Sequence, residues 1–175
     1  QLYFSPVSYT KAPKGRRPLM NPDPFAGFLF GMQPTRPTSR GHVELKSSDP
    51  YEGLAIHPNS LSTNHDCKEM IEGCRLLRKI AASPALQEVI ETELTPGPEV
   101  QTDEQMLDDV RNRCSTVFHP VSTCRMGPDR SDNVVDPRLR DYGVEGLRVV
   151  DASIFPTVTS GNTNAPAIMV GEKGA

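Results

Sequence analysis

The sequence is poor in the residues that build a large hydrophobic core. It contains no tryptophan, and only 36% of its 175 residues are hydrophobic. Prolines number 17 and glycines 13, which indicates long connections between modest helices and strands. A chain of this length could form one domain with its own interior, but this composition predicts less buried surface than the length would permit.

Long apolar runs and an excess of one charge are also missing. No hydrophobic run approaches the length of a membrane-spanning helix. The formal net charge is -3 at pH 7 and both signs are scattered along the chain, so there is no basic face for nucleic acid. We therefore expect small-molecule ligands, no nucleic-acid partner and no membrane span. No segment resembles a signal peptide, but this absence says nothing about secretion. A cytoplasmic location is the expectation.

Cysteine is scarce, and its spacing suits neither a disulfide framework nor a metal. Of the four cysteines, Cys67 and Cys74 share one face of a predicted helix but lie about 10 Å apart along its axis, beyond the reach of a disulfide. Cys114 and Cys124 lack the paired spacing typical of zinc sites. We predict free thiols in a reducing compartment and no metal site.

Strand patterns lie in the first part of the chain. Residues 1–9 alternate enough to form a strand, interrupted by Pro6. Residues 25–33 are apolar and aromatic, and residues 42–46 alternate, so both predict further strands. Together they indicate part of an antiparallel sheet. Residues 11–24 show no apolar period and predict a loop.

Helix patterns follow the strands. The strongest predicted helix starts at Thr63 or Asn64 and stops before Pro84, with apolar residues at spacings of three and four. A short helix is predicted over residues 85–92. The segment Thr102-Asp103-Glu104-Gln105 reads as a capping box, which announces a third helix.

Most of the candidate catalytic and binding residues lie between Val117 and Gly171. Residues 147–150 predict a short strand buried on both faces, ending at Asp151. A polar loop then enters a helix that has Pro166 in its first turn. The motifs in order are His119-Pro120, Thr123-Cys124-Arg125-Met126-Gly127, Val134-Val135-Asp136-Pro137, Gly143 to Ser153, Pro156, and Gly161-Asn162-Thr163-Asn164-Ala165-Pro166.

In this order the motifs closely resemble the C-terminal end of the glucose-methanol-choline (GMC) flavoprotein oxidoreductases, and most of all the choline dehydrogenase-like alcohol dehydrogenases. Upstream, residues 39–45 followed by Ser48-Asp49-Pro50 are similar to the family's substrate-domain strand. The resemblance implies an α/β fold for the whole enzyme. That fold combines a Rossmann-like FAD domain with a substrate domain whose antiparallel sheet is covered by helices.

The glycine-rich turn of such an FAD domain is missing. No Gly-x-Gly-x-x-Gly occurs, although an FAD-binding domain needs one to bring its backbone close to the pyrophosphate. We therefore interpret the chain as the C-terminal part of a larger enzyme, with the N-terminal FAD-binding part as its partner. We expect residues 1–115 to form most of the substrate-binding domain, and residues 116–175 to return to the FAD domain with the catalytic residues.

By this resemblance His119 is the catalytic base. Oxidation of an alcohol to an aldehyde or ketone by a flavin requires removal of the hydroxyl proton as hydride leaves the carbon, which suits a neutral imidazole. His42, His57 and His65 each have a simpler structural or solvent role. A primary alcohol, an amino alcohol such as choline, a sugar and an aromatic alcohol all stay open as substrates, as do the oxidase and dehydrogenase alternatives.

Asn162 matches the family's second catalytic position. Its amide would donate a hydrogen bond to the substrate oxygen, although a turn residue after Gly161 is the alternative interpretation. Helix capping is likewise the alternative for Thr163 and Asn164. The residues that the resemblance places near FAD are Asp151, Ala152, Ser153, Asn162, Thr163 and Asn164.

Two rival functions remain at this point. Cys124 and His119 could be the nucleophile and base of a cysteine hydrolase, an interpretation that depends on residue types alone. The chain could also belong to a non-catalytic binding relative on the same scaffold, but the intact His119 and Asn162 argue against this.

Overall fold

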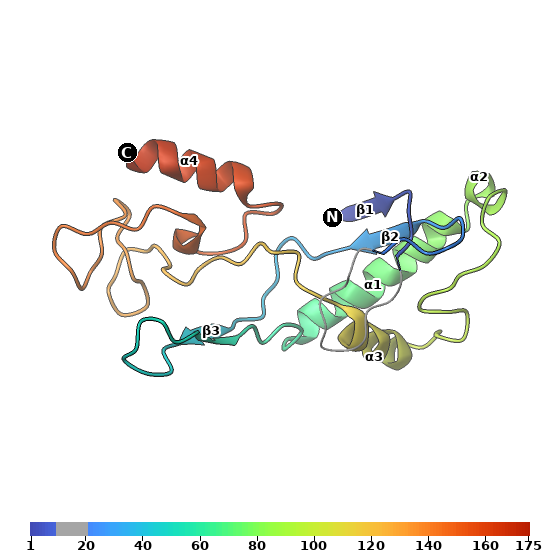
Figure 1. Cartoon of the computed structure of the whole chain (residues 1–175), viewed down its shortest axis with the longest axis horizontal. Helices are drawn as coiled ribbons and strands as arrows, with labels where there is room; N and C mark the ends of the chain where they lie inside the picture. The colour runs from blue at the N-terminus through green and yellow to red at the C-terminus, as the bar shows by residue number, and fades with distance from the viewer. Residues whose placement is uncertain (10–20) are drawn as a thin grey trace. The chain divides into compact units, whose positions relative to one another are not determined.

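The computed structural model describes residues 1–9 and 21–175 (Figure 1). They divide into two compact units: the first comprises Gln1–Pro34 and Thr63–Ser115, and the second comprises Thr35–Ser62 and Thr116–Ala175. Helices combine with small antiparallel sheets, which confirms the α/β class. Most of the loop predicted over residues 11–24 lies outside the described residues.

The first unit begins with an antiparallel pair of short strands. β1 (Leu2–Ser5) pairs with β2 (Leu29–Met32), and Leu2 lies opposite Met32. β1 ends before Pro6, as a residue without a backbone N–H requires. β2 is shorter than the predicted 25–33 because its partner offers only four residues for pairing.

The two longer helices of the first unit, α1 and α3, agree well with the prediction. α1 (Asn64–Ala81) starts after Thr63, whose hydroxyl accepts a hydrogen bond from the Asp66 backbone N–H. α3 (Asp103–Arg113) starts with the predicted capping box, since both the Thr102 and the Gln105 side chains bond to the backbone. α1 packs against β2 and α3.

The short helix that follows α1 was predicted too long. α2 (Pro84–Gln87) ends well before residue 92, and none of its side chains is buried. Without an apolar face packed on a neighbour, a short helix gains little from further turns.

The single antiparallel sheet expected from residues 25–33 and 42–46 is wrong. β3 (His42–Glu44) belongs to the second unit and pairs with β4 (Ala55–His57), in a sheet separate from that of β1 and β2. β4 was not predicted, because three residues before Pro58 are too few to show an alternating pattern.

The second unit is organised around one small apolar core. Val135 is fully buried there, between the short 3₁₀ helix η1 (Ala152–Ile154) and α4 (Asn164–Gly174). Pro166 lies in the first turn of α4, as predicted. The buried members of the core are Val135, Ile154, Phe155 and Val170.

The strand predicted over residues 147–150 is wrong. Arg148 forms only an isolated antiparallel bridge with Arg140, and Leu147 and Arg148 are both exposed. A strand buried on both faces needs paired neighbours and apolar cover. The described residues provide a single bridge at this point, and only Val149 and Val150 are partly covered by the Val135 core.

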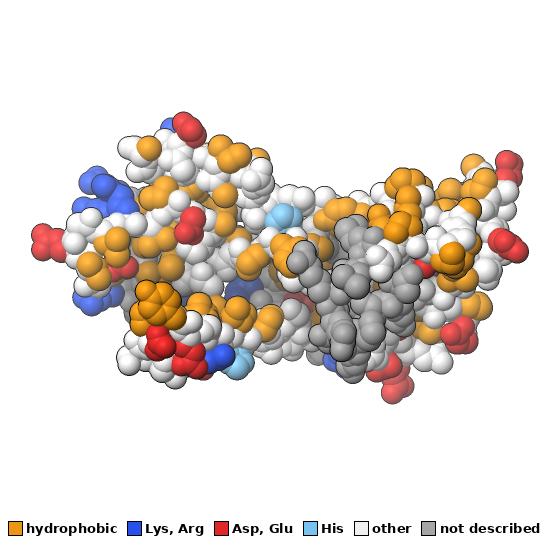
Figure 2. Space-filling model, viewed as in Figure 1, with side chains coloured by type: hydrophobic (Ala, Val, Ile, Leu, Met, Phe, Trp, Pro, Cys, Tyr) orange, Lys and Arg blue, Asp and Glu red, His pale blue; other side chains and the backbone are white. Residues whose placement is uncertain are grey.

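Many hydrophobic side chains lie on the surface (Figure 2). Among the described residues, large apolar side chains are more often exposed than buried, and Phe4, Ile56 and Ile168 are each more than half exposed. This agrees with the low core content predicted from composition. None of the described helices combines the length and the apolarity needed to cross a membrane.

Asp136 holds the turn that follows the buried Val135. Its carboxylate accepts hydrogen bonds from the backbone N–H groups of Arg138 at 2.7 Å and Arg140 at 3.0 Å, and from Arg140 Nε at 2.8 Å. The Arg140 side chain and these backbone donors favour the ionised carboxylate and hold the pKa of Asp136 below its usual value.

This lowered pKa predicts a loss of stability in acid. The ionised Asp136 stabilises the fold at pH values above the ordinary carboxyl pKa of 3.8, and the stabilisation is lost as the pH falls through the lower folded value. We expect Asp136→Asn to lower the free energy of unfolding at neutral pH and to flatten its dependence on pH below about 4. Denaturant unfolding of the full-length protein at several pH values measures this. The exposed Asp132→Asn is the control, and an equal effect there would contradict the role of Asp136.

Candidate active site

His119 follows a strained piece of backbone. Phe118 has a positive φ of 62°, a region that a non-glycine residue occupies at a cost of about 1–3 kcal/mol. Its N–H donates to Thr116 Oγ1 at 3.0 Å. On the other side, Val121 packs against the Val135 core, and the Ser122 hydroxyl donates to the Phe155 carbonyl at 2.6 Å. The backbone around His119 is therefore fixed on both sides.

The His119 side chain contacts the start of α4. Its Nδ1 lies 3.1 Å from Thr163 Oγ1, and the imidazole is half-buried. Thr163 is the N-cap residue of α4 and only 7% exposed, yet its side chain makes no capping bond. The hydroxyl is thus available to His119. When it accepts the Nδ1–H, the tautomer leaves the Nε2 lone pair free to take a proton.

Asn162 immediately precedes Thr163, so the His119 contact reaches the segment that carries it. The Asn162 side chain is exposed. Two residues earlier, Ser160 has a positive φ of 62°, and its hydroxyl accepts a hydrogen bond from Arg36 Nε at 2.6 Å. Arg36 therefore ties down the loop that leads to Asn162.

The sequence predicted that Asp151 ends a buried strand, but no strand forms at this point. It is exposed, and its carboxylate accepts a hydrogen bond from the Ser153 N–H at 2.7 Å, which caps η1. The cost of burying a carboxylate therefore does not arise. The Ser153 carbonyl accepts a hydrogen bond from the Cys124 N–H at 3.0 Å, so these two motifs are joined through the backbone.

Ser153 and the start of α4 fit the FAD that the resemblance implies. Ser153 Oγ is buried and has no hydrogen-bond partner among the described residues. A buried hydroxyl in this condition suits a polar ligand atom. At the start of α4 the Thr163 side chain does not cap the helix, and Asn164 is exposed. The positive end of this helix can therefore face an electron-rich group.

The cysteine hydrolase alternative is not favoured. No hydrogen bond joins Cys124 to His119 in the described part of the chain, and His119 Nδ1 faces Thr163. Cys124 is half-buried, and its N–H bonds to Ser153. No disulfide joins any of the four cysteines in the described part of the chain.

One cluster of side chains was missed by the sequence analysis. His42, Glu44 and His57 converge on one face of the β3–β4 sheet. The spacing of His42 and Glu44 was a usable signal, because residues two apart on a strand share a face. It was not used because β4, which brings His57 to them, was not predicted.

Comparisons with known proteins identify relatives of this chain. The family model for the C-terminal part of GMC oxidoreductases, described as "GMC oxidoreductase", matches residues 37–171. An alcohol dehydrogenase [acceptor] of Pseudomonas putida is 46% identical over 149 residues, or 85% of this chain and 27% of the relative. An oxygen-dependent choline dehydrogenase of Escherichia coli O157:H7 (strain EC4115 / EHEC) is 48% identical over 149 residues, which cover 85% of this chain and 26% of the relative.

Solved structures show a similar fold. The crystal structure of pyridoxine 4-oxidase from Mesorbium loti superposes with a TM-score of 0.77 and 35% identity, over 85% of this chain and 28% of that one. The chain thus spans about a quarter of the length of the curated relatives it matches.

The contact between Thr163 and His119 predicts a defined tautomer of the imidazole. Thr163→Val keeps the shape of the side chain but removes the hydroxyl, so we expect the preference between the two neutral tautomers to change. Thr163→Ser restores a hydroxyl and should restore the preference. The ¹⁵N chemical shifts of the His119 ring in the full-length protein measure the tautomer. Identical shifts in the valine variant and the unaltered protein would contradict the contact.

Proposed function

The chain belongs to the GMC oxidoreductase family, and on that premise we propose that it carries the catalytic residues of an FAD-dependent enzyme that oxidises an alcohol to an aldehyde or ketone. The hydrogen bond between His119 Nδ1 and Thr163 Oγ1 is the observation that carries this proposal. It brings a half-buried imidazole to the segment that contains Asn162. The names of two relatives, an alcohol dehydrogenase and a choline dehydrogenase, support a substrate with a CH–OH group.

We assign His119 as the base. With Nδ1 directed at Thr163, its Nε2 is the nitrogen that takes the substrate hydroxyl proton. Bound FAD would supply the other half of the reaction, acceptance of a hydride from the carbon that bears this hydroxyl. The strained backbone at Phe118 and the Thr163 contact together hold the imidazole in one orientation, which is the condition for efficient proton transfer.

We assign Asn162 as the hydrogen-bond donor to the substrate oxygen. An amide donates an N–H bond but does not compete for the proton, so it complements a histidine base. Its contribution grows as the oxygen gains negative charge in the transition state. Its exposed side chain is consistent with contact to a ligand rather than to the protein.

The remaining site residues are assigned to FAD. Ser153 has an unpartnered buried hydroxyl that can hydrogen-bond to the cofactor, and Asp151 and Ala152 lie beside it in the chain. Asn162, Thr163 and Asn164 line the start of α4, whose positive end would stabilise negative charge on the reduced ring. Ala152 and Val170 of α4 pack in the Val135 core, which holds both of these segments in place.

We further propose that the N-terminal FAD-binding part of the same enzyme is the partner of this chain. The exposed large hydrophobic side chains support this, because such surface is ordinarily covered. In this proposal residues 1–115 supply most of the substrate-binding domain, and residues 116–175 return to the FAD domain.

The assignment of His119 predicts a slow flavin reduction without it. We expect His119→Ala to reduce the rate by roughly 10²- to 10⁴-fold with FAD still bound, the range for losing a general base. Anaerobic mixing of the full-length enzyme with alcohol, followed by flavin absorbance, measures this step. The exposed His65→Ala is the control. The unaltered rate should rise with pH through one ionisation that disappears in His119→Ala, and its persistence at a near-normal rate would show that another group is the base.

Asn162→Ala should behave differently from His119→Ala. The base stays in place while one hydrogen bond to the oxygen is lost, so we expect a barrier increase on the order of 2–4 kcal/mol. The ionisation in the pH–rate profile should survive. Asn112 is another exposed asparagine, and it lies outside the proposed site. Asn112→Ala is therefore the control for the loss of an exposed amide. An unchanged rate, or loss of the ionisation in Asn162→Ala, would remove Asn162 from this role.

A further inference from the structure

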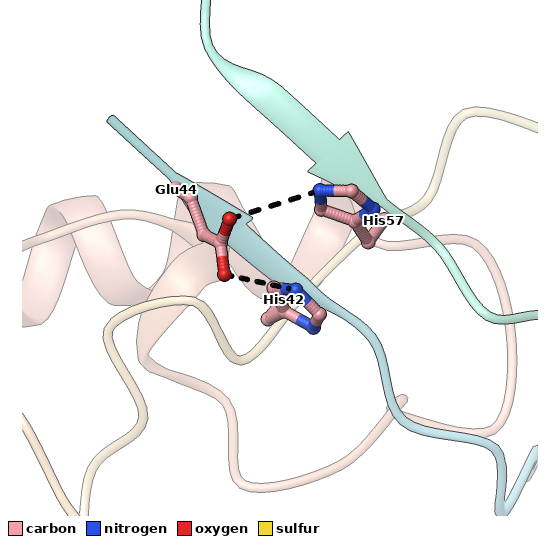
Figure 3. A group of neighbouring side chains, drawn as sticks. All are labelled: His42, Glu44 and His57. Carbon is pink, nitrogen blue, oxygen red and sulfur yellow. Dashed lines mark ion pairs between the residues drawn. The ribbon is translucent and has the colours of Figure 1, made fainter. Parts of the chain in front are cut away.

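The β3–β4 sheet brings three metal-ligating side chains together on one face (Figure 3). His42 and Glu44 are two residues apart on β3 and share a face, and His57 of β4 lies directly opposite His42. His42 Nε2 is 3.2 Å from one Glu44 carboxylate oxygen, and His57 Nε2 is 3.9 Å from the other. The two imidazoles and the carboxylate thus point toward a common centre.

The spacing of these atoms suits a small divalent cation. The three ligand atoms all lie within 4.8 Å of one another. Zinc binds nitrogen and oxygen ligands at about 2.0–2.2 Å in tetrahedral geometry, which places neighbouring ligand atoms about 3.3–3.6 Å apart. The separations of 3.2 and 3.9 Å in the cluster lie on either side of this range. The three side chains are exposed, so they can rotate to bring their ligand atoms into it.

Ion pairing alone accounts poorly for the arrangement. The side chains of His42, Glu44 and His57 are 60%, 61% and 51% exposed, and ion pairs this exposed contribute little stability. The two imidazole rings also stack, with centroids 4.6 Å apart and planes at 22°. Charging both rings would set two cations face to face, whereas one bound cation satisfies all three groups in their deprotonated forms.

The choice of ligands selects among the metals. Two imidazoles and one carboxylate suit zinc and the late first-row divalent ions, whereas magnesium and calcium prefer oxygen ligands alone. We propose that His42, Glu44 and His57 form a surface site for Zn²⁺, with the remaining coordination position open to water. None of these residues belongs to the proposed reaction site, so the two proposals are independent.

The bound ion would join the two strands. β3 and β4 have three residues each, and an isolated two-stranded sheet of this kind is marginally stable in water. A cation bound by both strands in the folded state alone stabilises that state by mass action. Zn²⁺ therefore acts as a clip that fixes the β3–β4 sheet.

The test is a Zn²⁺ titration of the full-length protein after removal of metal with a chelator. Competition with a chromophoric chelator gives the stoichiometry and affinity. We expect one equivalent of Zn²⁺ to bind. His57→Gln and Glu44→Gln should each weaken the Zn²⁺ affinity by about tenfold or more. His65→Gln is the matched control. His65 is 61% exposed and lies 3.8 Å from Glu69, but that pair has no third ligand in the described metal-ligating groups. We expect it to leave the titration unchanged.

The results separate the possibilities. A Zn²⁺ peak in the anomalous difference map at His42, Glu44 and His57 would confirm the site directly. Equal Zn²⁺ affinity in the unaltered protein, His57→Gln and Glu44→Gln would overturn the proposal, and so would a comparable loss in His65→Gln. Circular dichroism and the metal-free melting temperature show whether each variant is folded. If Glu44→Gln is unstable, the Zn²⁺ affinity of Glu44→Asp, which keeps a carboxylate, is measured in its place.

Discussion

One hydrogen bond, between His119 Nδ1 and Thr163 Oγ1, joins two segments that are 44 residues apart in the chain. The bond is effective because both of its ends rest on the same small core. Ile154 and Phe155 follow the residues that we propose to face FAD, Val170 belongs to α4, and all three pack with Val135. Loss of packing around Val135 would therefore disturb the imidazole, the loop with Asn162 and residues 151–153 together.

Aspartates do much of the work that strands do in other folds. The second unit has few ladder hydrogen bonds, so side-chain carboxylates hold its turns. Asp136 accepts from Arg138 and Arg140, Asp141 accepts from the N–H groups of Gly143 and Val144, and Asp151 caps η1. Asp136 and Asp151 both belong to the motifs that identify the family. Part of that recognisable pattern thus holds turns of the fold in place.

Local interactions were predictable from the sequence, and long-range ones were not. Thr63 and the capping box of Thr102 and Gln105 predict helices correctly because a cap acts within one helical turn. Residues 147–150 carry a strand pattern, but a strand depends on neighbours that the pattern does not specify. The resemblance supplied His119 and Asn162 as candidates, while the Thr163 contact and the His42, Glu44 and His57 cluster emerged only from the folded chain.

The left-handed backbone at Phe118 links the stability of the fold to the orientation of the His119 imidazole. Glycine adopts that conformation without strain, so it would suit position 118 better than phenylalanine on conformational grounds. The same freedom would widen the range of directions open to the neighbouring imidazole. Selection for heat resistance and selection for turnover would then favour different residues at position 118.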